Sequence, residues 1–375
     1  MISPKFFIEK LASLQIDFFT GVPDSLLKNI CAYITDNSSA ENNIIAANEG
    51  GAIGLAAGYH LATGKIPVVY MQNSGEGNII NPLMSLTDKD VYNIPLLLLI
   101  GWRGEPGIKD EPQHVKQGKV TLSLLETMGI KYEILSQDEE KCSIQLERAK
   151  KYMEETNEAF ALIVQKGAFC DYKLQNKAET MFSLSREKAI QIVTSSIEEN
   201  AIIVSTTGMI SRELFEYRES VKQGHEKDFL TVGSMGHASQ IALGIALQQK
   251  SRKIYCFDGD GATLMHMGSM AITASMKPTN YIHIIFNNGA HDSVGGQPTV
   301  GLQMNLPKIA EACGYQKAFS VSNIEELKQQ IETIKTVSGP TLLEIKVRKG
   351  ARKDLGRPTT TPIQNKEALM SFLNK

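Results

Sequence analysis

Short apolar runs recur along this chain, and most of them end in a glycine-rich or acidic turn that opens a helical pattern. The clearest one turns at DGDG, residues 258–261, continues as a helical segment, and returns in a second β-rich run that ends in NNG, residues 287–289. A strand, a helix and a strand in this order form a right-handed crossover between parallel neighbours. The pattern therefore predicts that Asp260 and Asn288 meet at one edge of a parallel sheet.

The same alternation continues through both halves of the chain. Buried-strand patterns such as PVVYMQ (67–72) and IPLLLLI (94–100) precede turns, and helical stretches separate them. Strands that alternate with helices are typical of α/β proteins with parallel sheets. The polar, aperiodic stretch 171–185 is the best linker, which predicts one domain over residues 1–170 and a second over residues 186–375.

A glycine pattern in the first half returns in the second. Three glycines recur at a constant offset of 186 positions, Gly50 as Gly236, Gly58 as Gly244 and Gly75 as Gly261. Three glycines can coincide by chance, but each pair has the same strand, turn and helix context. The repeat agrees with two similarly folded halves.

Composition narrows the class of protein. The chain has 375 residues, 42% of them hydrophobic, which is enough for two cores. A formal net charge of -2 and the lack of a basic block argue against nucleic-acid binding. The longest apolar run, 94–100, is too short to span a bilayer, and the N-terminus predicts an amphipathic helix rather than a signal peptide. The five scattered cysteines fit reduced thiols, so we expect a cytoplasmic protein without membrane contact.

Asp260 and Asn288 are chemically suited to a metal site. Both offer hard oxygen ligands beside flexible backbone and a helix start, an arrangement that holds Mg²⁺ and a diphosphate together. The motif GDG followed by NN resembles the cofactor signature of thiamin diphosphate enzymes. That resemblance implies Mg²⁺ ligands at Asp260, Asn288 and the carbonyl of Ala290, and cofactor contacts at Gly261 and Ala262. An ordinary acidic turn without a ligand is the alternative.

Glu49 lies between a brief β-run and a helix with little side-chain bulk, in IIAANEGGAIGLAAGYHLATG (44–64). Glycine inside a helix costs roughly 1 kcal/mol relative to alanine, so this many glycines indicate close packing, as at a subunit interface. A carboxylate that complements the helix dipole is one interpretation of Glu49. The segment also resembles thiamin diphosphate enzymes, in which such a glutamate hydrogen-bonds N1′ of the aminopyrimidine and promotes proton loss from the thiazolium carbon. The resemblance implies that Glu49 is catalytic and contacts the cofactor.

Two more candidates follow strand patterns. Asp24 stands in the turn GVPD, where it either caps the next helix or transfers protons at the active edge. The predicted loop GWRGEPGIKDEPQHVKQG (101–118) contains Gln113 and His114, where enzymes of this kind that act on pyruvate have two histidines. Half of that pattern is present, which makes Gln113 and His114 candidates for the catalytic site and His114 a candidate proton relay. An ordinary surface histidine is the alternative.

The turn GSMG, residues 233–236, separates a strand pattern from a helix of small residues. In thiamin diphosphate enzymes, a bulky apolar residue here wedges between the two cofactor rings, and the glycine two positions earlier offers its carbonyl to the 4′-amino group. The resemblance implies these roles for Met235 and Gly233, with Ser234 and Thr207 as further cofactor contacts. Methionine as a core filler is the alternative for Met235.

One subgroup of these enzymes is similar to the chain in particular. Most thiamin diphosphate decarboxylases have a middle domain, whereas this chain has room only for a linker. The blocks GVPDSLLK, QNSGEGNIINPLMSL and NNGAHDSVGGQPT look like those of the short phosphonopyruvate decarboxylases, within a match over about residues 18–362. The resemblance implies a pyrimidine-binding domain, then a diphosphate-binding domain, and a complete chain. It also implies active sites at the subunit interface of a homodimer or tetramer.

The implied reaction is the Mg²⁺- and thiamin diphosphate-dependent decarboxylation of 3-phosphonopyruvate to phosphonoacetaldehyde and CO₂, in phosphonate biosynthesis. Sulfopyruvate decarboxylation, carboligation and a silent thiamin-binding subunit are alternatives. A doubly charged phosphonate needs cationic partners. The candidates are Arg103, Lys109, Lys116, His291 and, in the tail, Arg348, Lys349, Arg352, Lys353 and Arg357. The basic tail is either solvated or an anion-attracting flap.

Overall fold

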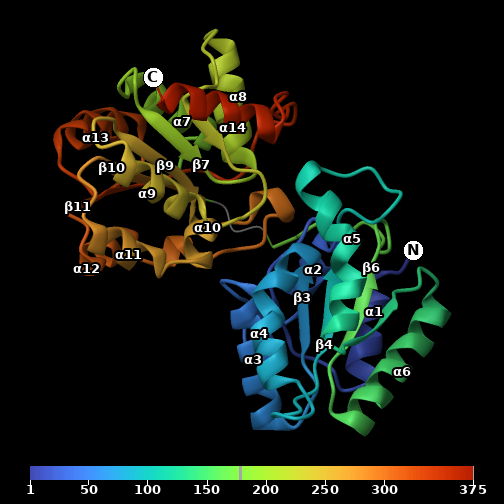
Figure 1. Cartoon of the computed structure of the whole chain (residues 1–375). Coiled ribbons are helices and arrows are strands. Elements are labelled where there is room, and N and C mark those ends of the chain that lie inside the picture. The colour runs from blue at the N-terminus through green and yellow to red at the C-terminus, as the bar shows by residue number, and fades with distance from the viewer. Residues whose placement is uncertain (177–179, 375) are drawn as a thin grey trace. The chain divides into compact units, whose positions relative to one another are not determined.

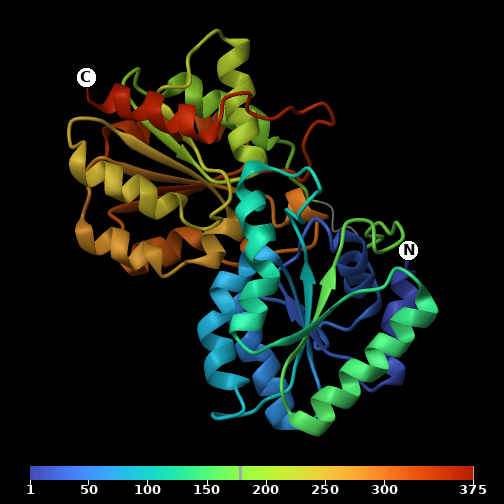
Figure 2. The ribbon, with the colours of Figure 1, turned by 45° about the vertical axis from the view of Figure 1, so that its right-hand side comes forward.

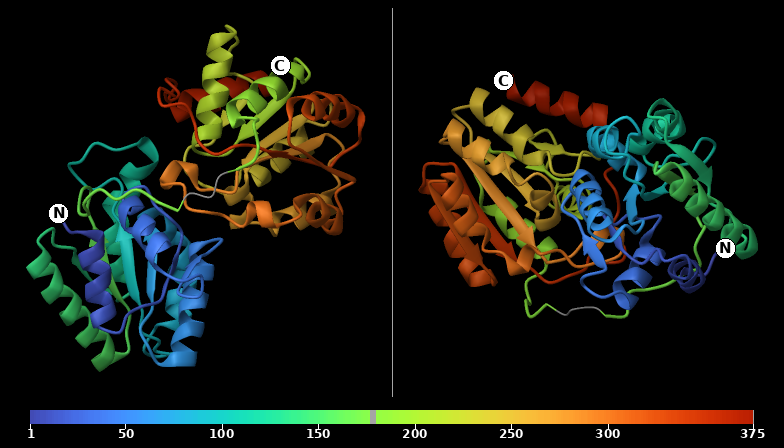
Figure 3. Two further views of the ribbon diagram at one scale, coloured as in Figure 1. Left: turned by 180° about the vertical axis from the view of Figure 1, so that it is seen from behind. Right: turned by 90° about the horizontal axis from the view of Figure 1, so that it is seen from below.

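The computed structural model describes residues 1–176 and 180–374. Residues 177–179 of the predicted linker and Lys375 of the predicted second domain lie outside the described residues. The chain forms two compact units, the first with residues up to 176 and 294–297, the second with residues 180–293 and 298–374. Each unit is a parallel sheet with helices on both faces (Figure 1, Figure 3). The predicted α/β class with two domains of this kind is confirmed.

Strands and helices alternate in the first unit. Its strands are β1 (Phe19–Gly21), β2 (Asn43–Ile45), β3 (Val68–Gln72), β4 (Leu97–Gly101), β5 (Lys131–Ile134) and β6 (Phe160–Val164). Its helices are α1 (Pro4–Ser13), α2 (Lys28–Asn37), α3 (Glu49–Thr63), α4 (Glu76–Leu86), α5 (Pro112–Thr127) and α6 (Glu139–Thr156), with the 3₁₀ turn η1 (Asn73–Gly75). Within residues 1–176 the strands form one six-stranded sheet in the order β2-β1-β3-β4-β6-β5, and each neighbouring pair is parallel.

Two apolar layers hold the first unit together. Phe7 of α1 and Leu146 of α6 are buried on one face of the sheet, and Ile53 of α3 and Leu83 of α4 are buried on the other. Figure 1 shows α1 and α6 on the opposite side of the sheet from α3 and α4. Burial of each such side chain contributes about 1.5–3 kcal/mol. Because β1, β3 and β4 are parallel neighbours, the segments that follow them lie together at the carboxyl edge of the sheet.

The second unit repeats this architecture. Its strands are β7 (Ile202–Ser205), β8 (Asp228–Leu230), β9 (Ile254–Gly259), β10 (Tyr281–Asn287), β11 (Lys317–Val321) and β12 (Thr341–Lys346). Its helices are α7 (Arg186–Ser196), α8 (Met209–Ser220), α9 (Ala238–Gln248), α10 (Asp260–Met265), α11 (Ser269–Met276), α12 (Leu306–Cys313), α13 (Ile324–Thr336) and α14 (Pro362–Leu373), with the 3₁₀ turns η2 (Asp292–Val294) and η3 (Gly301–Gln303). Helices α7, α8 and α13 pack on one face of the sheet, and α9, α11 and α12 pack on the other.

The strand order shows that the two units share one topology. The described part of the second unit has a six-stranded sheet in the order β11-β12-β10-β9-β7-β8. Counted from its own first strand and read from the β8 edge, this order is the same as that of the first unit. Gly75 follows β3 and Gly261 follows β9, which are equivalent strands. The prediction of two similarly folded halves is therefore confirmed.

Three further expectations from the sequence can be compared with the structure. All five cysteines are free, and Cys31, Cys142 and Cys256 are buried. The N-terminal segment forms the predicted helix α1, with Ser3 as its cap. In the described parts of the chain, every helix is too short or too polar to cross a membrane.

The start of α5 corrects the sequence analysis. The sequence predicts a loop over residues 101–118, but α5 begins at Pro112, and Gln113 and His114 lie in its first turn. Pro112 occupies the first position of this helix, where a proline is tolerated because the missing N–H has no partner within the helix. The two side chains are therefore presented by a helix rather than by a flexible loop.

A helix at the C-terminus was not predicted. Thr361 and Gln364 form a capping box that begins α14. Asn365 of this helix accepts a hydrogen bond from the Leu230 N–H at 3.0 Å and donates one to the Asp228 carbonyl at 2.8 Å. Helix α14, red in Figure 2, therefore satisfies backbone groups of the edge strand β8.

Candidate functional site

The predicted pair Asp260 and Asn288 lies at the carboxyl ends of adjacent strands. Strands β9 and β10 are parallel, and their register sets Gly259 opposite Phe286. The Asp260 carboxylate also accepts a hydrogen bond from the Asn288 backbone N–H. Both side chains are only 3% exposed. The structure thus brings together two residues that are 28 positions apart in the sequence.

Asp260 is held as a buried carboxylate. The Thr299 hydroxyl donates a hydrogen bond to its Oδ2, and burial raises its pKa to about 6. A methyl group on Gly301 would lie 2.6 Å from Asp260 Oδ2, so this position requires a glycine. A cation beside the carboxylate offsets the desolvation of its charge. Asp260 therefore fits a metal ligand.

Asn288 presents its amide oxygen to the same edge. Its Oδ1 accepts the Ala290 N–H at 3.0 Å, and its Nδ2 donates to Asp292 Oδ2 at 2.6 Å. Amide and carbonyl oxygens accept more than one partner, so Oδ1 keeps a lone pair for a cation. A carboxylate, an amide oxygen and the Ala290 carbonyl are the oxygen donors that Mg²⁺ prefers. The residues present fit the metal predicted from the sequence.

The predicted cofactor-contact residues of the second unit also converge. The Gly233 N–H donates to the Thr207 hydroxyl at 3.1 Å. Gly233 and Ser234 both have positive φ angles, of 72° and 46°, so the turn is held in an uncommon conformation. A methyl group on Gly261 would lie 3.5 Å from Cε of Met235. The Met235 side chain therefore lies over the glycine turn that follows β9, with Ala262 buried in the next position.

His291 approaches the same glycine from the loop that follows Asn288. A methyl group on Gly261 would lie 3.1 Å from Cε1 of the His291 ring. Burial lowers the pKa of His291 to about 4, so its imidazole is neutral at pH 7. A neutral ring is a weak partner for a phosphonate dianion. His291 is therefore a better neighbour for the cofactor than an anion anchor.

Glu49 is the first residue of α3 and is 5% exposed. The Asn48 side chain caps the helix by accepting the Gly51 N–H at 2.8 Å. Asn78 Nδ2 donates to Glu49 Oε2 at 2.7 Å and fixes one carboxylate oxygen. A methyl group on Gly75 would lie 2.6 Å from Oε1 of Glu49. Glu49 therefore has a defined orientation that depends on the glycine turn after β3.

Asp24 has contacts that fit both interpretations of its role. Its Oδ2 accepts the backbone N–H groups of Leu26 at 2.8 Å and Leu27 at 3.3 Å, as a capping carboxylate does. Its Oδ1 accepts from Gln72 Nε2. Burial raises the pKa of Asp24, and a methyl group on Gly101 would lie 2.4 Å from Oδ2. Asp24 is thus a completely buried acid that spans the ends of three strands.

His114 is 8% exposed, which excludes an ordinary surface histidine. Its Nε2 lies 3.4 Å from Gln113 Nε2, and its Nδ1 has no hydrogen-bond partner within residues 1–176 and 180–374. Burial and the nearby Arg103 lower the pKa of His114 to about 4. The ring is neutral at pH 7, so it accepts a proton poorly and donates only an N–H.

Glu76 was missed by the sequence analysis. It is completely buried at the start of α4, directly after Gly75. Among the described residues, neither carboxylate oxygen makes a hydrogen bond of normal geometry, although Thr121 and Gln117 of α5 lie nearby. Burial raises the pKa of Glu76 to about 8. An acidic residue in the turn QNSGEGN after a buried strand was the available signal.

Two of the arginines considered as phosphonate anchors already have acidic partners. Arg103 Nε donates to Asp110 Oδ2 at 2.7 Å, and its Nη2 donates to Asp110 Oδ1. Arg352 forms ion pairs with Glu187, Glu216 and Asp354. The tail therefore lies along α7 and α8 of the second unit (Figure 2). Lys109 and Lys116 are exposed.

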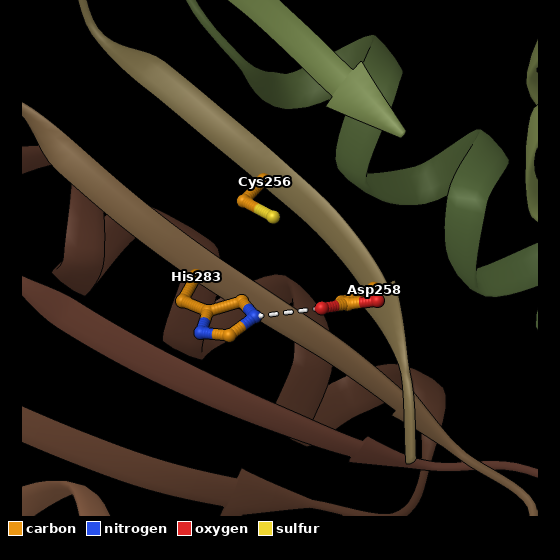
Figure 4. A group of neighbouring side chains, drawn as sticks. All are labelled: Cys256, Asp258 and His283. Carbon is orange, nitrogen blue, oxygen red and sulfur yellow. Dashed lines mark hydrogen bonds and ion pairs between the residues drawn. The ribbon is translucent and has the colours of Figure 1, made fainter. Parts of the chain in front are cut away.

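Cys256, Asp258 and His283 form a buried group on β9 and β10 (Figure 4). Their donor atoms lie within 4.8 Å of one another. Asp258 Oδ1 accepts the Gly259 N–H at 3.0 Å, and Oδ2 lies 3.4 Å from His283 Nε2. Closed zinc sites use four ligands, and burial raises the pKa of the Cys256 thiol, which disfavours the thiolate. The geometry fits an internal hydrogen-bonded pair that fixes the turn before Asp260 better than a metal centre.

Two family models match the chain. Residues 4–124 match the thiamine pyrophosphate enzyme, N-terminal TPP binding domain, and residues 206–345 match the C-terminal TPP binding domain. The chain is 30% identical to phosphonopyruvate decarboxylase of Streptomyces viridochromogenes, over 100% of this chain and 95% of that protein. It is 31% identical to the enzyme of that name from Streptomyces hygroscopicus, over 96% and 92%. It is 30% identical to sulfopyruvate decarboxylase of Methanosarcina acetivorans, over 92% and 90%.

Proposed function

We propose that this chain, which belongs to the short two-domain thiamin diphosphate-dependent decarboxylases, converts 3-phosphonopyruvate to phosphonoacetaldehyde and CO₂. The observation that carries the proposal is the similarity along the whole chain to two proteins named phosphonopyruvate decarboxylase. The sulfopyruvate enzyme is similar over nearly the same length and supplies the second candidate. The phosphonate substrate implies a place in phosphonate biosynthesis.

The second unit is proposed to hold the diphosphate end of the cofactor. Asp260, Asn288 and the Ala290 carbonyl would bind Mg²⁺, and Gly261 would let the backbone approach the phosphates. The turn with Met235, together with Thr207, Gly233, Ser234 and Ala262, would contact the rings and their linker. Bound thiamin diphosphate supplies the electron sink that lets CO₂ leave from the 2-oxo acid.

Glu49 is proposed to hold a proton at N1′ of the cofactor's pyrimidine ring. Its support is the fixed carboxylate, with one oxygen bound to Asn78 and the other packed against Gly75. A carboxyl group in a buried position exchanges a proton with a ring nitrogen without competition from water. The neighbouring Asn78 keeps the orientation constant between turnovers.

Asp24 is the proposed donor of the proton that replaces CO₂ on the substrate carbon. Its raised pKa keeps the carboxyl protonated more readily than an exposed aspartate, and Gln72 orients it. The proton moves from Asp24 to carbon, and solvent returns one proton to Asp24 after product release. His114, neutral at pH 7, would orient the substrate with Gln113 rather than supply the proton.

A phosphonate dianion requires positive charge in the site. Lys109 and Lys116 are exposed near the start of α5 and carry positive charge close to Gln113 and His114 in the sequence. Arg103 keeps its positive charge, but Asp110 occupies two of its donors. The lysines are therefore proposed as the primary anion contacts in the first unit.

The active unit is proposed to be at least a homodimer. Helix α3 leaves open space at Gly54 and Gly58, and Leu61 beside them is 75% exposed. Met84 of α4 is also exposed, at 42%. A small-residue face with exposed apolar side chains is suited to close packing against a second copy. The five free cysteines support a cytosolic location for this assembly.

A paired assay tests the proposal. The purified chain, freed of metal and cofactor, is supplied with phosphonopyruvate or sulfopyruvate, with and without thiamin diphosphate and Mg²⁺, and CO₂ release is measured. We expect turnover of phosphonopyruvate only when both additions are present. Preferred turnover of sulfopyruvate establishes the second candidate, acyloin product indicates a carboligase, and no CO₂ from either substrate contradicts the assignment.

A further inference from the structure

The amide of Asn288 has two chemically different ends, so a metal site built on it needs the oxygen to face the ion. In this structure both ends are constrained. Nδ2 donates to Asp292 Oδ2 at 2.6 Å, and Oδ1 accepts the Ala290 N–H at 3.0 Å. A flipped amide would set oxygen against a carboxylate and NH₂ against an N–H. The orientation is therefore fixed from two sides.

Asp292 is itself held by two donors from distant parts of the second unit. Arg186 Nη1 donates to Asp292 Oδ2 at 3.1 Å, and the Gly350 N–H donates to the same oxygen at 2.9 Å. Arg186 and Gly350 are 106 and 58 positions away in the sequence. A charge-assisted bond to a carboxylate with three donors is stronger than a neutral one. Asp292 is thus a fixed point rather than a mobile side chain.

Buried charge anchors Arg186. It is 5% exposed, and its Nε and Nη2 donate to the two oxygens of Glu213 at 2.8 and 3.0 Å. One arginine therefore faces two carboxylates, Glu213 and Asp292. Asp292 is the member of this group that contacts the Asn288 amide, so Arg186 links the metal-side amide to a second buried carboxylate, Glu213.

The chain after β12 completes the arrangement. The Val347 N–H donates to the Asn287 carbonyl at 2.9 Å, and the Arg348 N–H donates to the Leu184 carbonyl at 2.8 Å. These bonds lead the backbone to Gly350, which adopts a positive φ of 93°. A left-handed φ is accessible to glycine at little cost. The C-terminal segment therefore contributes a backbone donor to the metal loop.

We propose that Asp292 is a positioning residue that orients the Asn288 amide toward the metal ion, with Arg186 and the Gly350 N–H holding Asp292 in place. The inference rests on the proposed role of Asn288 as a Mg²⁺ ligand. Removal of a residue that positions a metal ligand typically weakens metal binding by 10- to 100-fold. Loss of Asp292 lets the amide rotate, so the oxygen faces the ion in only part of the molecules.

The test measures Mg²⁺ affinity rather than turnover. Metal-free protein with excess thiamin diphosphate is titrated with Mg²⁺ in a calorimeter. We expect Asp292→Ala to raise the Mg²⁺ Kd by about tenfold. Asp292→Asn keeps an acceptor oxygen for Asn288 and is expected to stay within about threefold of wild type. The control is Asp354→Asn, a change at an exposed carboxylate that pairs with Arg352 and is expected to leave the Kd unchanged.

A second background separates orientation from general electrostatics. In Asn288→Asp both ends of the side chain are oxygens, so no orientation is needed. We expect Asp292→Ala not to raise the Mg²⁺ Kd in that background, where it also removes the repulsion between two carboxylates, whereas it raises the Kd about tenfold in wild type. The same loss in both backgrounds overturns the positioning role and leaves only a charge effect. The unfolding midpoints of the metal-free variants identify any variant that fails to fold.

Two outcomes separate this inference from the proposed function. If Asn288→Ala weakens Mg²⁺ binding and Asp292→Ala does not, the inference is wrong and the ligand assignment stands. If Asn288→Ala leaves the Mg²⁺ Kd unchanged, the ligand assignment and the inference both fail. A wild-type chain that binds neither Mg²⁺ nor thiamin diphosphate overturns the proposed function together with both.

Discussion

The carboxyl edges of the two sheets occupy equivalent places in one topology, yet their side chains are paired differently. In the first unit the buried acids Asp24 and Glu49 are paired with amides and backbone N–H groups, and Glu76 has no hydrogen bond of normal geometry within the described residues. In the second unit a buried arginine, Arg186, holds Asp292 behind Asn288. The shared strand order places the candidate side chains at equivalent edges, and at the second edge a buried arginine is among their partners.

The two edges therefore favour different chemistry. A buried acid with neutral partners keeps its proton to a higher pH, as the raised pKa values of Asp24 and Glu76 show. At the second edge the Asp292 carboxylate, which Arg186 and the Gly350 N–H hold, accepts a hydrogen bond from the neutral Asn288 amide and can orient it. The first edge is thus suited to moving protons, and the second is suited to binding a cation. Each of the following changes tests one side of this comparison.

The largest expected effect follows from Glu49→Gln. The amide keeps the shape and the contact with Asn78 but removes the transferable proton. We expect turnover to fall by about 10²- to 10⁴-fold, the range for general acid–base groups. Thiamin diphosphate binding, measured by calorimetry, is expected to stay within a few-fold of wild type. Glu41→Gln, at an exposed position, is the control, and equal turnover of both variants would refute the role of Glu49.

The second effect concerns the carboxyl edge of the second sheet, where Asp260 and Asn288 lie. Asp260→Ala removes a proposed ligand itself, so the loss of Mg²⁺ affinity is expected to exceed the 10- to 100-fold typical of residues behind a ligand. The measurement is the same Mg²⁺ titration in the presence of thiamin diphosphate. Asp258→Ala, in which the removed carboxylate pairs with His283, serves for comparison and is expected to affect folding stability more than Mg²⁺ affinity. Wild-type affinity in Asp260→Ala is the contradicting outcome.

The third effect is a pH dependence of folding stability that Glu76 causes at the carboxyl edge of the first sheet. Folding raises the pKa of Glu76 from 4.5 to about 8, so between these pH values the folded chain keeps a proton that the unfolded chain has released. Stability therefore falls as the pH rises from about 4.5 to about 8, by on the order of 4 kcal/mol at about 1.4 kcal/mol per unit. Glu76→Gln stays neutral and is expected to remove this decline in urea unfolding at pH 5 and pH 8. A decline of equal size in Glu76→Gln would show that other groups cause it.

The smallest expected effect is at Gly58 of α3. A methyl group there meets open space in the single chain, so Gly58→Ala is expected to stabilise the dilute protein by about 1 kcal/mol through helix propensity. If a second copy covers α3, the same methyl weakens the dimer, and the gain disappears at high protein concentration. Over a dilution series, urea unfolding measures the free energy of unfolding and light scattering measures dimer formation. Lys119→Ala, at an exposed position of α5, is the control. A gain that is independent of concentration would place the interface elsewhere.

Local patterns were enough to predict that Asp260 and Asn288 lie close together. Asp260 and Asn288 each follow a strand pattern, and a right-handed crossover brings such ends together without knowledge of any other contact. Helix α14 also begins at a local signature, because Thr361, Pro362 and Gln364 form a capping box with a proline at the start of the helix. The same holds for the start of α5 at Pro112.

Other features depend on contacts that no periodic pattern encodes. The burial of Glu76 results from α5, which packs beside it about forty residues later in the chain. The partners of Asp292 come from α7 and from the segment after β12. Sequence patterns predict elements and their order, whereas the protonation of Glu76 and the anchoring of Asn288 depend on tertiary packing.

The hydrogen bond from the Gly350 N–H to Asp292 has a consequence for the synthesis of the protein on the ribosome. The loop with Asn288 and Asp292 is translated about sixty residues before Gly350, whose N–H donates to Asp292, and chains emerge from ribosomes at about 5–20 residues per second. For several seconds a nascent chain therefore has Asn288 without its full anchor. A protein truncated before residue 350 by a premature stop codon would keep every proposed ligand of the ion. It would still lack the Gly350 N–H, one of the donors that hold Asp292 in place.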